Sequence, residues 1–200
     1  MRDFHLPGRS SVFASNGMCA TSNPLATKVA LSILEQGGNA VDAAIAGGIL
    51  LGICEPQMTG IGGDCFILLK TQNSKKIVAL NGSGKSPKNL TAEKLTSKGL
   101  SIVPDNSVDS VTIPGAIDAF CRLSEDYGKA GLAKTLAPAI HYAENGIPVG
   151  PRTSFDWKQN AKNLQGIARD YYLLNGDVPT PGQIFKAPKQ ADVLRKISID

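Results

Sequence analysis

The sequence predicts an α+β fold, because segments with helical periodicity stand before and after two short apolar runs joined by a polar turn. The two runs, 65–70 and 76–80, have the length and spacing of an antiparallel hairpin. The 200 residues are 42% hydrophobic and 19% charged, which is enough apolar material for one sizeable core. We therefore expect a layered protein in which helices pack on a small sheet.

The first helix is predicted from residues at both of its ends. Asn23 can cap it, and Pro24 suits the first helical position. Gly37 or Gly38 can end it in the left-handed conformation. The apolar positions that would form its buried face recur every four residues: Leu25, Val29 and Ile33.

The second helix should follow at once. Asn39 can cap it, and Asp42 stands three positions later, as in a capping box. Residues 43–54 offer no polar face, so we expect a helix that is buried on all sides. This run is shorter than the roughly 20 apolar residues that a membrane span needs, so no membrane partner is expected.

The remaining elements follow from breaks in periodicity. We expect a third strand at 108–113, helices at 114–128 and 132–146, a loop at 175–185 and a helix at 190–200. Pro138 should bend or restart the second of these helices. Between 151 and 175 the pattern is too weak to assign elements.

Charge and cysteine usage exclude several classes of function. The net charge is +4, and the lysines are scattered without interleaved aromatic residues, so no nucleic-acid partner is expected. The cysteines form no CxxC pair, which argues against a zinc site, and no other metal or cofactor is indicated: Cys19, Cys54, Cys65 and Cys121. The first residues lack an apolar core of signal-peptide length, which favours a cytoplasmic location and leaves a periplasmic one as the alternative.

Two glycine-rich stretches invite a functional interpretation. "GIGGD", 60–64, stands between a helix and a strand, the reverse of the order in a phosphate-binding loop. "NGSGKSP", 81–87, lacks the first glycine of a Walker A loop, and Asn81 and Lys85 occupy the outer positions of a nucleophile elbow. The second stretch is either a turn or a ligand-contacting loop at a strand end.

A complete catalytic constellation is missing from the chain. Only His5 and His141 could act as histidine bases, and His141 falls in the middle of a predicted helix. No HExxH motif occurs, and no pair of carboxylates stands out.

Several longer motifs in register supply an explanation. The stretches "GMCATSNPLAT", "ILEQGGNAVDAAIA", "EPQMTGIGGDCF", "VTIPGAIDAF" and "LAPAIHYAENGIPVGPR" lie within residues 15–155. Together they resemble the γ-glutamyltransferase family, also called glutathione hydrolases. The resemblance implies part of an αββα sandwich of the N-terminal-nucleophile hydrolase type. It also implies a precursor that cuts itself into a large and a small subunit.

The resemblance places the chemistry outside this chain. The nucleophile would be the new N-terminal threonine of the small subunit, expected beyond Asp200. Residues 1–200 would then be an N-terminal fragment of one such domain, inactive alone. The expected partners are a small-molecule acyl amide and the protein's own small subunit. The glycines of 60–64 would serve close packing between helix and sheet.

One departure from the family bears on the substrate. After the second hairpin strand the family commonly reads Asp-Phe-Arg-Glu, two further residues and Pro, and the arginine binds the α-carboxylate of the γ-glutamyl group. Here Ser83 stands at the arginine position, Gly84 at the glutamate position, and Lys85 is the nearest cation. A neutral serine cannot replace a bidentate guanidinium. We therefore predict Ser83 and Lys85 as substrate-binding residues.

Three functions stay open on this sequence. The first is cleavage of γ-glutamyl amides such as glutathione, with acyl transfer to water or an amine. The second is a related amidase or acylase with a different acyl group, which Ser83 favours. The third is a non-catalytic relative.

Overall fold

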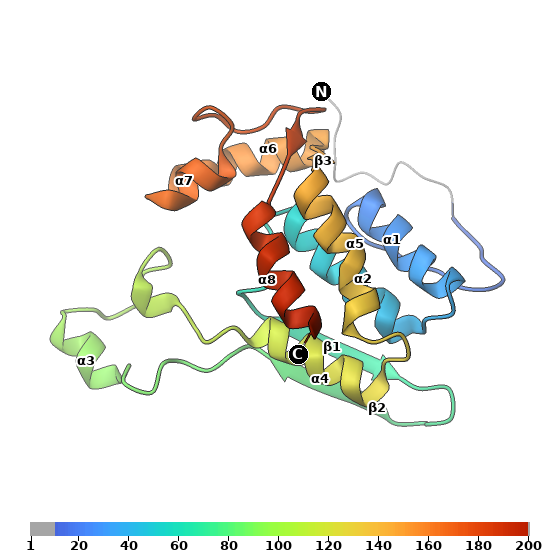
Figure 1. Ribbon diagram of the computed structural model, residues 1–200. Helices are drawn as coiled ribbons and strands as arrows, with labels where there is room; N and C mark the ends of the chain where they lie inside the picture. Colours follow the sequence, from blue (N-terminus) through green and yellow to red (C-terminus); the bar gives the residue numbers. More distant parts are fainter. Residues whose placement is uncertain (1–10, 200) are drawn as a thin grey trace. The chain divides into compact units, whose positions relative to one another are not determined.

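The computed structural model describes residues 11–199, which form two compact units (Figure 1). One unit is built from the chain up to Met58 and from Gly128 onward, and the other is Thr59–Tyr127. Across the described residues, none of the helices has the length and apolar character needed to cross a membrane. His5 and Asp200 lie outside the described residues.

The helical unit has a core of four helices that pack in sequence: α1 with α2, α2 with α5, and α5 with α8 (Figure 1). They span Pro24–Glu35, Ala40–Cys54, Leu132–Asn145 and Pro188–Ile199. The predicted ends of α1 are confirmed. Asn23 Oδ1 accepts a hydrogen bond from Leu25 N at 3.0 Å, and Gly37 adopts a φ of 85° after the last turn.

Helix α2 begins at the predicted capping box. Asn39 Oδ1 accepts from Asp42 N at 3.1 Å, and Asp42 Oδ2 accepts in return from Asn39 N at 2.8 Å. The helix is buried on most of its surface, as expected, although Ala44 is exposed. Helix α5 runs without interruption through Pro138.

The region from Pro151 to Phe185 contains elements that the sequence pattern did not reveal. Helix α6 spans Pro151–Asn160, the 3-10 turn η2 spans Ala161–Asn163 and helix α7 spans Ile167–Tyr172. Strand β3, Ile147–Pro148, pairs antiparallel with β4, Ile184–Phe185, inside the stretch predicted as loop. The Trp157 ring lies edge-on to the Phe185 ring, with centroids 4.9 Å apart, and anchors α6 to this pair.

The second unit is built on the predicted hairpin. Strand β1, Cys65–Lys70, pairs antiparallel with β2, Ile77–Gly82, from Cys65 opposite Gly82 to Lys70 opposite Ile77. Helix α4, Gly115–Tyr127, contacts both strands and lies along one face of the hairpin (Figure 1). On the other face, Phe66 and Leu68 are 69% and 79% exposed.

The third predicted strand, 108–113, is absent from the described structure, and this prediction is wrong. Val108–Ser110 forms the 3-10 turn η1 instead. Ser107 Oγ accepts from Asp109 N at 3.0 Å, and Ser110 Oγ donates to Ser107 O at 2.6 Å. Such local side-chain bonds compete with pairing in a sheet.

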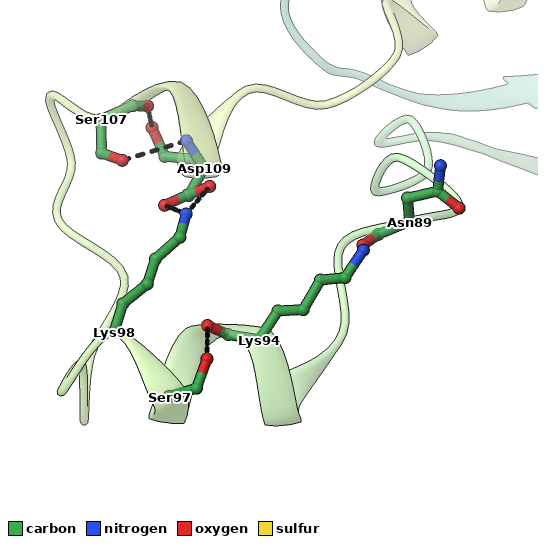
Figure 2. A network of polar contacts seen from close by, with 7 residues as sticks. Asn89, Lys94, Ser97, Lys98, Ser107 and Asp109 are labelled. Carbon is green, nitrogen blue, oxygen red and sulfur yellow. Dashed lines mark hydrogen bonds and ion pairs between the residues drawn. The ribbon is translucent and has the colours of Figure 1, made fainter.

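The segment between β2 and α4, residues 83–114, contains η1 and the short helix α3, Ala92–Ser97 (Figure 2). Lys98 Nζ lies 2.7 Å from Asp109 Oδ2, which links the end of α3 to η1. Lys94 Nζ donates to Asn89 O at 2.6 Å. These contacts are all made within the segment 83–114. Figure 1 shows the segment extending away from the hairpin.

Candidate functional site

A cavity of about 470 Å³ lies where the end of β2 meets the start of α4. One wall is formed by residues 81–85, and the other by residues 113–115 and Asp118. Both walls belong to the same compact unit. The cavity therefore lies at a strand end, where ligand contacts are common.

Glycines bring the two walls together. A Cβ atom added to Gly84 would lie 2.2 Å from Ile113 O, and one added to Gly115 would lie 2.3 Å from Gly82 O. Gly84 also has a φ of +72°, which side chains other than glycine rarely adopt. Ile113 N donates to Lys85 O at 2.9 Å, so the two walls are also hydrogen-bonded. Larger residues at Gly84 or Gly115 would force the walls apart.

The sequence predicts a close-packing role for the glycines of 60–64, and within the described residues Gly60 and Gly62 show no close approach. A Cβ atom added to Gly60 or Gly62 would meet no atom within 4 Å. The loop is instead fastened by its backbone, because Ala116 N donates to Gly63 O at 2.9 Å at the start of α4. Close backbone approach is found at Gly84 and Gly115.

The structure places Ser83 and Lys85 on the lining of this one cavity. Ser83 is partly buried, and its N–H donates to Asn81 Oδ1 at 3.0 Å, which fixes the turn after β2. Lys85 is exposed and is the cation of the lining, while Asp118 is its carboxylate. Asp118 also pairs with Arg122, at 3.2 Å. A role for Ser83 and Lys85 in substrate binding remains a prediction.

Sequence reasoning did not identify the second wall of the cavity. Its signal is present in "VTIPGAIDAF", which contains Pro114 and Gly115, but the local pattern there predicts a strand leading into a helix and indicates no cavity. The histidine that the structure describes, His141, lies exposed on α5 in the other unit. Its Nδ1 lies 3.2 Å from Asn145 Nδ2, as expected for a surface helix residue.

The cysteines are free thiols with little nucleophilic character. Burial raises the pKa of Cys54 to about 12, and the neighbouring Glu55 adds to the rise. Burial also raises the pKa of Cys65 and of Cys121. Because the thiolate is the reactive form, a raised pKa makes these groups poor nucleophiles at neutral pH.

The chain is similar in sequence to proteins of one known family. The family model described as Gamma-glutamyltranspeptidase matches residues 26–200. The chain is 37% identical over 194 residues to the glutathione hydrolase-like YwrD proenzyme of Bacillus subtilis (strain 168). That match covers 94% of this chain and 36% of the relative, so the chain spans little more than a third of the relative's length.

Two solved structures have closely similar folds. The cephalosporin acylase from Bacillus halodurans matches with a TM-score of 0.89 and 40% identity, over 98% of this chain and 38% of that one. The gamma-glutamyltranspeptidase of Helicobacter pylori matches with a TM-score of 0.87 and 28% identity, over 95% of this chain and 56% of that one.

Proposed function

Because the chain belongs to the gamma-glutamyltranspeptidase family, we propose that it is the front part of a self-cleaving amide hydrolase that acts on γ-glutamyl amides. The observation that carries the proposal is the family match over residues 26–200. The cavity between the end of β2 and the start of α4 would hold part of the acyl group. The mature protein would pair this region with its own small subunit.

The chemistry follows from a nucleophile of the N-terminal type. The hydroxyl of an N-terminal threonine outside this chain would attack the amide carbonyl, while its free amine accepts the hydroxyl proton. The C–N bond breaks, the proton passes to the leaving amine, and an acyl ester remains on the threonine. Water or a second amine then attacks the ester and releases the acyl group. None of these steps requires a metal or a cofactor.

The cavity would contribute recognition of the acyl group. An α-carboxylate directed toward residues 83–85 would meet Lys85, since Ser83 offers only a neutral hydroxyl. A lysine acts as a point charge and lacks the bidentate fork of arginine. We therefore expect glutamyl groups to bind through Lys85 with moderate affinity.

A second candidate is an acylase whose acyl group carries no α-carboxylate. The specific observation that favours it is the neutral Ser83 in the cavity wall. The likeness to a cephalosporin acylase, at 40% identity, adds support.

The experiment uses the full-length protein and four p-nitroanilides. The γ-glutamyl compound carries the amine and the α-carboxylate, glutaryl only the carboxylate, 4-aminobutyryl only the amine, and butyryl neither. Self-cleavage into two pieces with fastest turnover of the γ-glutamyl compound is the expected result. Fastest turnover of the butyryl or 4-aminobutyryl compound would support the acylase, and an uncut, inactive protein would contradict both.

A further inference from the structure

A second cavity, of about 530 Å³, lies in the helical unit. It opens to solvent and is lined by residues of α6, η2, α7 and the turn that follows α7. It shares no lining residue with the cavity near Ser83. Three cations from three elements line it, namely Lys158 of α6, Lys162 of η2 and Arg169 of α7, and Asp177 is its carboxylate.

Hydrogen bonds hold the cavity wall around these three cations in place. The turn Leu174–Asp177 is closed by two reciprocal backbone hydrogen bonds, at 2.8 and 3.1 Å. Asn175 and Gly176 have φ values of 54° and 85°, as a tight hairpin turn requires. Ser154 Oγ donates to Pro179 O at 2.8 Å and ties α6 to the segment beyond the turn. The walls are therefore held by hydrogen bonds independent of the three cations.

None of the three cations pairs with a carboxylate in the part of the chain that the structure describes. Elsewhere on α6, by contrast, Arg152 Nε lies 2.6 Å from Asp156 Oδ2. All three cations line the same cavity, so their like charges repel one another there.

Stabilisation of helix ends is a simpler explanation for the positions of these cations, and the experiment below distinguishes it from ligand binding. Lys158, Lys162 and Arg169 each lie in the last turn of their element, where a cation stabilises the helix dipole. This effect accounts for a basic residue at each helix end. It does not account for three basic residues around one cavity that contains a single carboxylate.

We propose that this cavity binds a small, multiply charged anion that also carries a hydrogen-bond donor. Arg169 can hold two oxygens of a phosphate or carboxylate group at once, and the two lysines add point charges. Asp177 would accept a hydrogen bond from a hydroxyl group of the ligand, or would disfavour a ligand without one. Phosphate esters and hydroxylated polycarboxylates share this chemistry.

Titration calorimetry on the full-length protein tests the proposal, with glycerol 2-phosphate and citrate as probes at constant ionic strength. We expect at least one probe to bind at least tenfold more tightly than acetate. The ratio of the two affinities identifies the preferred group, and either preference supports the site. Thermal midpoints should rise with the tighter anion, because a ligand that binds only the folded state stabilises it.

Three variants locate the binding. Lys158→Gln should weaken the tighter anion roughly tenfold, as the loss of a charged contact does. Arg169→Lys keeps the charge and should also weaken binding, because it removes the bidentate contact. The matched control is Lys196→Gln, which removes a lysine from the last turn of α8 and should leave the affinity unchanged.

Two results would overturn the proposal. The first is the absence of binding tighter than that of acetate for both probes. The second is equal weakening by Lys158→Gln and Lys196→Gln, which would show that only net charge matters. The three cations would then only stabilise the ends of their helices.

Discussion

The carboxylate of Asp42 accepts hydrogen bonds from the backbone N–H of Lys129, 87 residues away, at 3.0 and 3.1 Å. Ala130 N donates to the same carboxylate at 3.1 Å, and Asn39 N donates at 2.8 Å within the capping box. Asp42 is fully buried. One acidic side chain therefore holds the start of α2 and the turn before α5.

Asp42→Asn should destabilise the helical unit. The substitution keeps the size of the side chain but turns an amide NH₂ toward backbone donors, and each hydrogen bond to a charged group contributes about 1.5–3 kcal/mol. We expect a lower thermal midpoint and faster hydrogen exchange at the amides of Lys129 and Ala130. The control is Glu35→Gln, an exposed position on α1, which should change neither. Unchanged exchange at both amides would contradict this role.

Gly115→Ala should damage the cavity near Ser83. The new Cβ atom would lie 2.3 Å from Gly82 O and from Gly84 N, and these backbone atoms cannot move without opening the turn. We expect lower stability and lower activity of the full-length protein. Gly62→Ala is the matched control, because nothing lies within 4 Å of its added Cβ. Equal effects of the two substitutions would refute the assignment of close packing to Gly115.

Cys54 should resist alkylation in the folded protein. Burial is the main cause that raises the pKa of its thiol to about 12, so the reactive thiolate is rare at pH 8. Mass spectrometry after brief iodoacetamide treatment should find Cys54 modified only once urea is added. Rapid modification of native Cys54 would show that it is accessible.

The same group gives stability a dependence on pH. A thiol whose pKa is raised on folding stabilises the protein fully below its unfolded pKa, near 9, and this contribution is lost as the pH rises toward 12. Wild-type stability should therefore fall more steeply between pH 9 and 12 than that of Cys54→Ala. Parallel pH profiles would contradict the shift.

Residues 1–200 expressed alone should not hydrolyse γ-glutamyl-p-nitroanilide. The reason is the absence of the proposed nucleophile from this chain, independent of how well the piece folds. The measurement is absorbance of released nitroaniline against a blank without protein. Turnover that persists after repeated purification would show that the nucleophile belongs to residues 1–200.

The sequence predicted elements whose signals are local. Asn23, Asn39 and Asp42 mark helix starts through bonds to residues two or three positions away, and the hairpin follows from two short apolar runs joined by a polar turn. The α+β class and the family are confirmed. The strand predicted at 108–113 failed because Ser107 and Ser110 bind their own neighbouring backbone.

Elements that depend on distant contacts escaped prediction. Strand β3 exists because Ile147 pairs with Phe185, and α6 is anchored by the contact between Trp157 and Phe185. Neither element has a local sequence pattern that predicts it. The position of Ser83 and Lys85 beside a cavity was predicted from the family resemblance. The opposite wall depends on how closely Gly115 approaches Gly82, which only the folded chain reveals.

If the loop at residues 83–85 contacts the acyl group, as we propose, substrate preference is the most direct test. The quantity to measure is kcat/KM for γ-glutamyl-p-nitroanilide divided by that for the 4-aminobutyryl compound, which lacks only the α-carboxylate. A charged contact to a carboxylate contributes roughly 1.5–3 kcal/mol, or about one to two decades. Ser83→Arg should therefore raise the ratio by that factor, and Lys85→Ala should lower it.

Lys88→Ala serves as the control, because Lys88 is an exposed lysine three residues beyond Lys85 and does not line the cavity. It should leave the ratio unchanged. We predict opposite shifts of the ratio for Ser83→Arg and Lys85→Ala, with Lys88→Ala equal to wild type. A ratio that neither substitution changes would contradict this prediction, because Ser83 and Lys85 would then have no contact with the acyl group.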